Sequence, residues 1–173
     1  MKTIVRAAEL PTLLAEAPEG IEILSLDCFD TLIWRNVQSP GDIFPDLPVP
    51  GGAIWSRKRC ESRARRRARF SEERDEVSIE EIYATLYPAA GDKARSEAIA
   101  GELTAEARHC YGFAPTAALI RDAKARGLKV IIVSDTYLSE PQLRRLIAAA
   151  AGEEIAGLID RVFCSSAYGV GKA

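Results

Sequence analysis

The sequence predicts an α/β fold, in which a parallel sheet carries an inserted block of helices. Three short apolar segments with strand character lie at residues 21–26, 129–134 and 159–164, and helical patterns separate the last two. Strands that alternate with helices in this way form parallel sheets with right-handed crossovers. Residues 36–112, between the first two strands, show helical patterns and little strand signal. The fold class is therefore a parallel α/β core interrupted by helices.

The length supports the same division. A chain of 173 residues fits one domain, or a core with a small insert, and is long enough to bury a real core. We assign residues 1–35 and 113–173 to the core and residues 36–112 to the helical insertion. The core begins with a helical pattern over residues 3–17, broken near Pro11.

The first strand ends at a group of polar residues. Residues 21–26 form an apolar run rich in β-branched side chains, which indicates a buried strand. The run stops at Asp27, and Asp30 and Thr31 follow. A carboxylate at the carboxyl end of a buried strand lies where open α/β sheets bind ligands. Asp is also a frequent turn former, so a purely structural role stays open for both acids.

The insertion begins with a loop and continues with three helices. Residues 36–52 hold four prolines and three glycines, which predicts loop. Helices are expected over about residues 53–70 and 92–110. Between them, Ser78 begins a capping-box pattern that opens a helix running through about Leu86.

The first helix of the insertion carries a dense basic run. Its members are Arg57, Lys58, Arg59, Arg63, Arg65, Arg66, Arg67 and Arg69. A solvated helix face is the favoured interpretation, because an acidic stretch follows at residues 71–76 and can neutralise part of the run. Contacts to an anionic substrate and binding of nucleic acid are the alternatives. The lone His109 is interpreted as structural, because no Ser or Cys motif accompanies it.

The second half of the core has clear helix boundaries. Pro115 suits the first turn of a helix through Arg126, and Gly127 suits the position just after it. Another helix is expected over residues 140–151, after the second strand.

Composition narrows the class of protein. The hydrophobic fraction is 47%, and the formal net charge of −2 provides no global field that would attract nucleic acid or anionic lipid. The N-terminus shows no signal-peptide pattern, and no run approaches the roughly 18 apolar residues of a membrane span. The four cysteines lack zinc-like spacing, which suggests reduced thiols. A cytoplasmic protein with neither nucleic acid nor membrane as partner is expected.

Three stretches in order resemble the motifs of the haloacid dehalogenase (HAD) superfamily. Residues 27–32, DCFDTL, are similar to the first motif, and residues 130–135, VIIVSD, to the second. Lys172 is similar to the third-motif lysine. The stretches FDTLIWR, SPGDIF, SDTYL and SSAYGVGK further resemble a bacterial HAD-like subfamily linked to surface-polysaccharide glycosyltransferases. The resemblance implies a Rossmann-like core whose parallel sheet is truncated after its third strand, with a small α-helical cap at residues 36–112.

The resemblance also implies roles for individual residues. Asp27 would be the covalent nucleophile, Ser134 would bind the phosphoryl group, and Lys172 would balance its charge. Magnesium would be held by the Asp27 carboxylate and the backbone carbonyl of Phe29. Asp30, Thr31 and Asp135 are possible supporting residues.

Two features depart from the family pattern. Phosphatases of this superfamily usually carry a second Asp two residues after the nucleophile, as the general acid and base, but Phe29 stands there. The next acid, Asp30, is offset by one residue and can instead hold the loop through backbone amides. An acidic fourth motif would follow Lys172, so we expect the sequence to be a fragment of a longer protein that is inactive by itself. A shortened HAD-like domain that does no chemistry alone is the alternative. The magnesium site would then be incomplete, and the first strand would lie at a sheet edge.

The functional expectation is a HAD-like phosphatase that acts on a small phosphorylated metabolite through an aspartyl-phosphate. A non-catalytic HAD-like module that binds or positions a glycosyltransferase is the first alternative, and Phe29 motivates it. A metal-independent, dehalogenase-like hydrolase is the second, since those enzymes also lack the second Asp.

Overall fold

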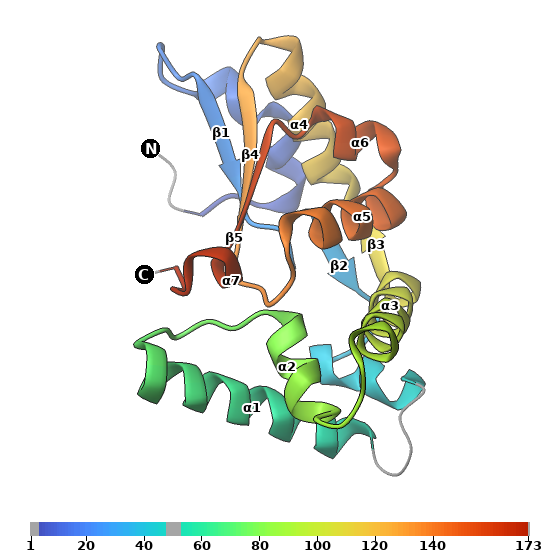
Figure 1. Cartoon of the computed structure of the whole chain (residues 1–173). Coiled ribbons are helices and arrows are strands. Elements are labelled where there is room, and N and C mark those ends of the chain that lie inside the picture. The colour runs from blue at the N-terminus through green and yellow to red at the C-terminus, as the bar shows by residue number, and fades with distance from the viewer. Residues whose placement is uncertain (1–3, 48–52, 173) are drawn as a thin grey trace.

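The computed structural model describes residues 4–47 and 53–172 and shows a mixed α/β protein. A small parallel sheet with its helices forms one end of the molecule, and the helices of the insertion form the other (Figure 1). The predicted α/β class with a parallel sheet is therefore confirmed at this level.

The sheet of the described residues has three parallel strands. They are β1 (Ile23–Leu26), β4 (Lys129–Ser134) and β5 (Arg161–Cys164), in the order β1-β4-β5. Leu26 pairs with Ile132 and Ser134 pairs with Cys164, so the carboxyl ends of the strands lie at one edge. This register brings the residues that follow β1 and β4 together.

The expectation that the first strand is buried is wrong for β1. Ile21 is 41% exposed and Ile23 is 50% exposed, and no residue of the strand is fully buried. The reason is its position, since β1 pairs with β4 on one side and with no other strand in the described chain. The central strand β4 is buried at every second residue instead.

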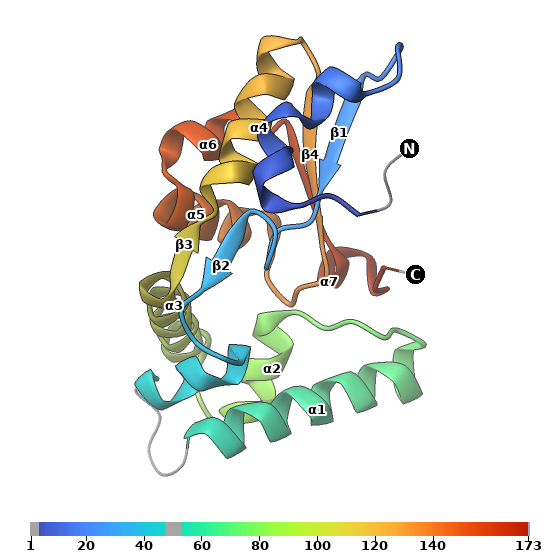
Figure 2. The ribbon, with the colours of Figure 1, turned by 180° about the vertical axis from the view of Figure 1, so that it is seen from behind.

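Helices cover the sheet. The 3₁₀-helix η1 (Ala7–Glu16) packs against α4 (Ala114–Ala125), and the two lie side by side over the sheet in Figure 2. The helix α5 (Glu140–Ala151) packs on β5 and on the short helix α6 (Glu153–Leu158), and α7 (Ser165–Tyr168) directly follows β5.

The residues that were predicted to mark helix boundaries do so. Pro115 lies in the first turn of α4, and Gly127 follows its end with a φ of +80°. The hydroxyl of Ser78 accepts a hydrogen bond from the amide of Glu81, and the Glu81 carboxylate accepts one from the amide of Ser78. Each of these contacts satisfies a backbone donor at the start of a helix.

A two-stranded ribbon that the sequence did not reveal joins the two ends of the molecule. Its antiparallel strands are β2 (Ile33–Arg35) and β3 (Cys110–Gly112). A side chain at Gly112 would come within 2.8 Å of the Ala151 Cα atom, so this crossing against α5 requires glycine. Strands of three residues leave too little periodicity to be recognised in a sequence.

In its described residues, the insertion contains four helical elements. They are the 3₁₀-helix η2 (Pro40–Asp46), α1 (Ala53–Glu72), α2 (Ile79–Leu86) and α3 (Asp92–His109). The prediction of loop over residues 36–52 is wrong for η2, which Ser39 caps through its hydroxyl. Residues 48–52 of that prediction lie outside the described residues.

A buried arginine holds the insertion together. The Arg57 side chain is 0% exposed, and its Nε and Nη2 donate to the two carboxylate oxygens of Glu102 at 2.7 and 2.8 Å. The Tyr83 hydroxyl donates to the same carboxylate at 2.7 Å. Burial opposes the charged guanidinium, but the hydrogen bonds and charge of Glu102 outweigh it and raise the pKa of Arg57. Helices α1, α2 and α3 therefore meet at one ion pair.

The prediction that the basic run lies on a solvated helix face is wrong for Arg57 and only partly right for Arg65. Arg65 bonds Glu76 at 2.7 Å and Glu61 at 3.3 Å, and its side chain is 32% exposed. Arg59, Arg63 and Arg66 are exposed, as expected. His109 contacts Asn36 and Asp46 through its two ring nitrogens and joins the ends of the insertion, in keeping with a structural role.

In the described part of the chain, no helix is both long enough and apolar enough to cross a membrane.

We predict that Arg57→Met lowers the free energy of unfolding by about 3–5 kcal/mol, because it leaves the Glu102 carboxylate buried and unpaired. Adding Glu102→Gln should restore much of the loss, since the amide is neutral and still accepts from Tyr83. Chemical denaturation followed by circular dichroism measures both. Arg121→Met is the control, because Arg121 pairs with Glu154 on the surface and its loss should matter little. An Arg57→Met protein as stable as the native chain would contradict the prediction.

We further predict that the four cysteines react with iodoacetamide in the order of their exposure. Cys28 and Cys164 are buried, whereas Cys60 and Cys110 are partly exposed, and burial and the Glu106 charge raise the pKa of Cys110 to about 12. Burial raises the pKa of Cys164 to about 11 and that of Cys28 further still, so neither carries appreciable thiolate at pH 8. Peptide mass spectrometry after short labelling should find Cys60 modified first. Equal rates at Cys28 and Cys60 would show that β1 does not pack as described.

Candidate functional site

The carboxyl ends of β1 and β4 are joined by one lysine. The ammonium of Lys172 lies 3.0 Å from the Asp27 carboxylate and donates to the backbone oxygen of Val133 at 3.1 Å. The side chains of Asp27 and Lys172 are 43% and 38% exposed, so a ligand can reach both. Three of the sequence-predicted residues are thereby gathered at one edge, since Ser134 directly follows Val133.

Backbone and side-chain contacts fix the Asp27 carboxylate. Its Oδ1 accepts a hydrogen bond from the amide of Cys28 at 2.7 Å and also faces Lys172. In the described chain, Oδ2 has no hydrogen-bond partner. One oxygen is therefore held and the other is free to meet a ligand.

A tight loop follows Asp27. The carbonyl of Cys28 accepts hydrogen bonds from the amides of Leu32 and Ile33, which folds the chain back at once. Asp30 has a φ of +56°, a conformation that short polar residues tolerate better than others. The backbone oxygen of Thr31 accepts from the Thr116 hydroxyl of α4 at 2.7 Å, and this contact anchors the loop to the core. Thr31 therefore supports the loop.

The Phe29 side chain packs against an arginine. The Arg35 guanidinium lies 4.1 Å from the centre of the Phe29 ring, within the range of a cation–π contact. The same guanidinium donates from Nε to Glu106 at 2.6 Å. Phe29 thus presents an aromatic ring that supports an arginine.

Ser134 has an unusual environment. It is 1% exposed, and its hydroxyl is the one buried side-chain polar atom without a hydrogen bond in the described residues. Buried hydroxyls nearly always find a partner, and an unsatisfied one costs about 1–3 kcal/mol. The Ser134 hydroxyl is therefore a buried polar group that bonds no other group of the described chain.

The residues after Ser134 are tied to the end of the chain. The amide of Thr136 donates to the Ser165 hydroxyl at 2.9 Å, and the amide of Lys172 donates to the Asp135 carboxylate at 2.8 Å. Asp135 therefore positions the backbone of Lys172, whose side chain reaches Asp27. The predicted site residues Asp27, Asp30, Asp135 and Lys172 therefore lie within one cluster of loops.

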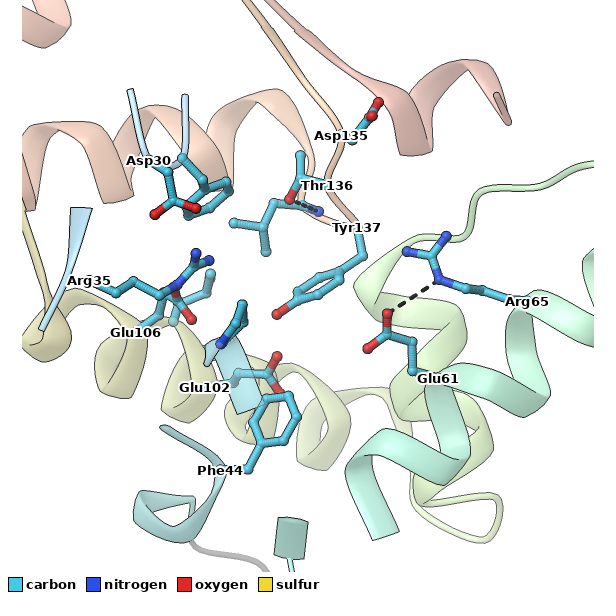
Figure 3. Close-up of a pocket in the computed structure, with 14 residues that line it drawn as sticks. Asp30, Arg35, Phe44, Glu61, Arg65, Glu102, Glu106, Asp135, Thr136 and Tyr137 are labelled. Atoms are coloured by element: carbon cyan, nitrogen blue, oxygen red, sulfur yellow. Dashed lines mark hydrogen bonds and ion pairs between the residues drawn. The ribbon is translucent and has the colours of Figure 1, made fainter. Parts of the chain in front are cut away.

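A cavity of about 360 Å³ opens beside this cluster (Figure 3). The loops after β1 and β4 form one wall through Phe29, Asp30, Thr136 and Tyr137, and β2, η2, α1 and α3 form the other. The second wall presents charged and aromatic side chains, namely Arg35, Phe44, Glu61, Arg65, Glu102 and Glu106. The cavity thus lies between the sheet end and the insertion.

Most of the charges around the cavity are already paired. Arg35 bonds Glu106, Arg65 bonds Glu61, and Glu102 bonds the buried Arg57. The carboxylate of Asp30 is exposed and forms no hydrogen bond or ion pair with described residues. The Tyr137 hydroxyl points into the cavity in Figure 3 and likewise bonds nothing in the described chain. Burial and the nearby Glu102 charge raise the pKa of Tyr137 well above its ordinary value, so it remains a proton donor.

Sequence reasoning missed the second wall of the cavity. Arg35 ends the stretch FDTLIWR, but no role was predicted for it, and Glu102 and Glu106 belong to none of the stretches that resemble the family. A weak signal existed for the two glutamates. They are four residues apart on a predicted helix and therefore share one of its faces.

The donors for a metal ion are few. Among residues 4–47 and 53–172, no three His, Cys, Asp or Glu side chains are grouped as a metal site. Asp27 and Asp135 are nevertheless linked through Lys172, and Mg²⁺ is commonly held by one or two carboxylates with waters and substrate phosphates completing its shell. Two carboxylates at one edge, with the Phe29 carbonyl nearby in sequence, match that donor set.

No protein-family model matches this chain, and no curated protein matches its sequence significantly. What the site can do is therefore inferred from its own residues.

We predict that Ser134→Ala raises the free energy of unfolding by about 1 kcal/mol, because it removes a buried hydroxyl that has no partner. Ser165→Ala is the matched control and should be destabilising, since the Ser165 hydroxyl accepts from the Thr136 amide and donates to its carbonyl. Denaturant unfolding of both variants measures the difference. A destabilised Ser134→Ala protein would mean that this hydroxyl bonds a group within the folded chain.

Proposed function

We propose that the chain is a HAD-like hydrolase that removes the phosphoryl group from a small phosphate monoester. The observation that carries this proposal is the 3.0 Å contact between Asp27 and Lys172 at the carboxyl ends of two adjacent parallel strands, the second of which ends at Ser134 with its unsatisfied hydroxyl. A nucleophile, a compact cation and an unused hydrogen-bond donor are what aspartate-based phosphoryl transfer requires.

Two features of the fold support the resemblance to the HAD superfamily. All three strands of the sheet β1-β4-β5 are parallel. Asp27 and Asp135, which lie in two of the stretches that resemble family motifs, follow β1 and β4 at the same edge of this sheet. The helices α1, α2 and α3 are inserted after the first strand and cover that edge, as a Rossmann-like core with an α-helical cap would require.

The reaction follows from the roles of these groups. Oδ2 of Asp27, which is free of hydrogen bonds in the described chain, attacks the phosphorus atom and forms an acyl phosphate. The bond from phosphorus to the ester oxygen breaks, and that oxygen leaves as an alcohol after gaining a proton. Water then attacks the phosphorus, releasing phosphate and restoring the Asp27 carboxylate. Throughout, Lys172 offsets negative charge and the Ser134 hydroxyl donates to a phosphoryl oxygen.

The proton for the leaving alcohol needs a source other than position 29. Asp30 lines the cavity into which the alcohol would extend, and it has no competing hydrogen bond in the described chain. Asp30 is therefore the residue we assign to general acid and base chemistry, one position after the usual place.

Magnesium fits the site as a partner of the substrate phosphate. Asp27 and Asp135 would hold the ion with the Phe29 carbonyl, and the ion would supply further charge neutralisation. The carboxylate of Asp27 stays oriented by Cys28 and Lys172 in either case.

A non-catalytic binding module, such as one that positions a glycosyltransferase, is the second candidate. The observation that favours it is Phe29, whose ring is packed beneath Arg35 in the place of the usual acid. Such a module would keep the site and bind a phosphorylated ligand without turnover.

We predict that the native chain hydrolyses an aryl phosphate in the presence of Mg²⁺ and that Asp27→Asn abolishes this activity. Loss should be at least about 10⁴-fold, since the amide cannot form the acyl phosphate. Phosphate release measures the rate, and Asp122→Asn, at a partly exposed position of α4 where the carboxylate pairs with Arg126, is the control. Mass spectrometry with beryllium fluoride tests trapping at Asp27 independently. Turnover that survives in Asp27→Asn would refute the nucleophile, and trapping without turnover would favour the binding module.

A further inference from the structure

The cavity beside Asp27 carries an excess of negative charge. Besides Asp135, which belongs to the proposed magnesium site, four carboxylates line it, those of Asp30, Glu61, Glu102 and Glu106, against the guanidinium groups of Arg35 and Arg65. The buried Arg57 behind Glu102 adds one further positive charge and leaves the excess negative. A ligand that already brings a phosphoryl group would therefore be repelled if it carried a second anion here.

The cavity also offers hydrogen-bonding groups of both kinds. The Tyr137 hydroxyl and the Nη atoms of Arg35 are donors without a partner in the described chain, since Arg35 uses only its Nε on Glu106. The Asp30 carboxylate is an acceptor without a partner there. A hydroxyl group both donates and accepts, whereas an ammonium only donates and a carboxylate only accepts. A ligand that carries several hydroxyl groups therefore matches these unpaired donors and this unpaired acceptor best.

Size and apolar lining limit the ligand further. The volume of about 360 Å³ lies at the small end of the usual range for ligand pockets, roughly 300–1,000 Å³. Phe29, Phe44, Leu103 and Leu138 supply apolar surface between the polar groups. A single compact carbon skeleton with C–H faces fits this lining.

We infer that the cavity binds the alcohol part of the phosphate ester and selects an uncharged, polyhydroxylated skeleton the size of one monosaccharide. This inference rests on the proposed function, because it assumes that the phosphoryl group lies at Asp27, Ser134 and Lys172. The two sites share the loops after β1 and β4. Asp30 follows Asp27 by three residues, and Thr136 follows Ser134 by two.

The test compares ligands with one carbon skeleton and different charge. Asp27→Asn protein is titrated calorimetrically with glucose 6-phosphate, 6-phosphogluconate, glucosamine 6-phosphate and inorganic phosphate. We expect glucose 6-phosphate to bind at least about tenfold tighter than inorganic phosphate and 6-phosphogluconate, an increment that one or two net hydrogen bonds supply. Equal or tighter binding of 6-phosphogluconate would overturn the inference. So would glucosamine 6-phosphate binding more than about tenfold tighter than glucose 6-phosphate, which would assign the cavity to a cation.

A substitution in the cavity sharpens the test. Tyr137→Phe keeps the ring against Arg57, whose guanidinium lies 4.9 Å from its centre, and removes only the hydroxyl. It should weaken glucose 6-phosphate by about threefold to tenfold and inorganic phosphate by much less. Tyr111→Phe, on the exposed strand β3, should change neither. Equal weakening of both ligands by Tyr137→Phe would overturn the role of the cavity.

The outcome for inorganic phosphate separates the two proposals. If phosphate does not bind, the proposed function fails, and free glucose, gluconate and glucosamine become the probes of the cavity. Preferential binding of glucose then supports the inference, and absence of glucose binding overturns it. If phosphate binds but the three esters do not differ, the proposed function stands and the inference fails.

Discussion

The buried ion pair between Arg57 and Glu102 is the constraint on which the rest of the structure depends. It joins α1 to α3, and the Tyr83 hydroxyl brings α2 to the same carboxylate. The Arg57 guanidinium also lies 5.0 Å from the ring of Phe44 and 4.9 Å from that of Tyr137, which belong to η2 and to the loop after β4. One charged group therefore connects the insertion to the loop after β4 and lies behind Glu102, which lines the cavity.

The sequence predicted the fold wherever local chemistry determines it. The capping pattern at Ser78 and the Pro115 and Gly127 boundaries of α4 depend on neighbouring residues alone, and the central strand β4 has a clear apolar run. The failures have a different cause. The exposure of β1 depends on which strands lie beside it, and β2 and β3 are three-residue strands that exist because Gly112 can approach α5. Neither the exposure of β1 nor the pairing of β2 with β3 can be recognised from a local sequence pattern.

The candidate site divides in the same way. Asp27, Ser134 and Lys172 follow strands or occupy motif positions, so the sequence could single them out. The structure adds the 3.0 Å contact that joins Asp27 to Lys172 and the lack of a partner for the Ser134 hydroxyl. The opposite wall was only partly visible. Arg35 and Phe44 lie in stretches that resemble the family, but Glu102 and Glu106 do not, and the basic run of α1 suggested a solvated face. A buried arginine and an exposed one have the same local sequence signature, and only the distant Glu102 distinguishes Arg57 from its neighbours.

The pairing of β1 with β4 also bears on how the chain is made. Parallel strands need a long crossover, and here the whole insertion separates the two, so that Ile23 pairs with Lys129. At the usual rate of synthesis, β1 leaves the ribosome on the order of 5–20 s before its partner. Its apolar residues Ile23, Leu24 and Leu26 remain unpaired for that time. The strand is only four residues long, includes Ser25 and is followed by Asp27. A short apolar segment bounded by polar groups resists aggregation while it waits.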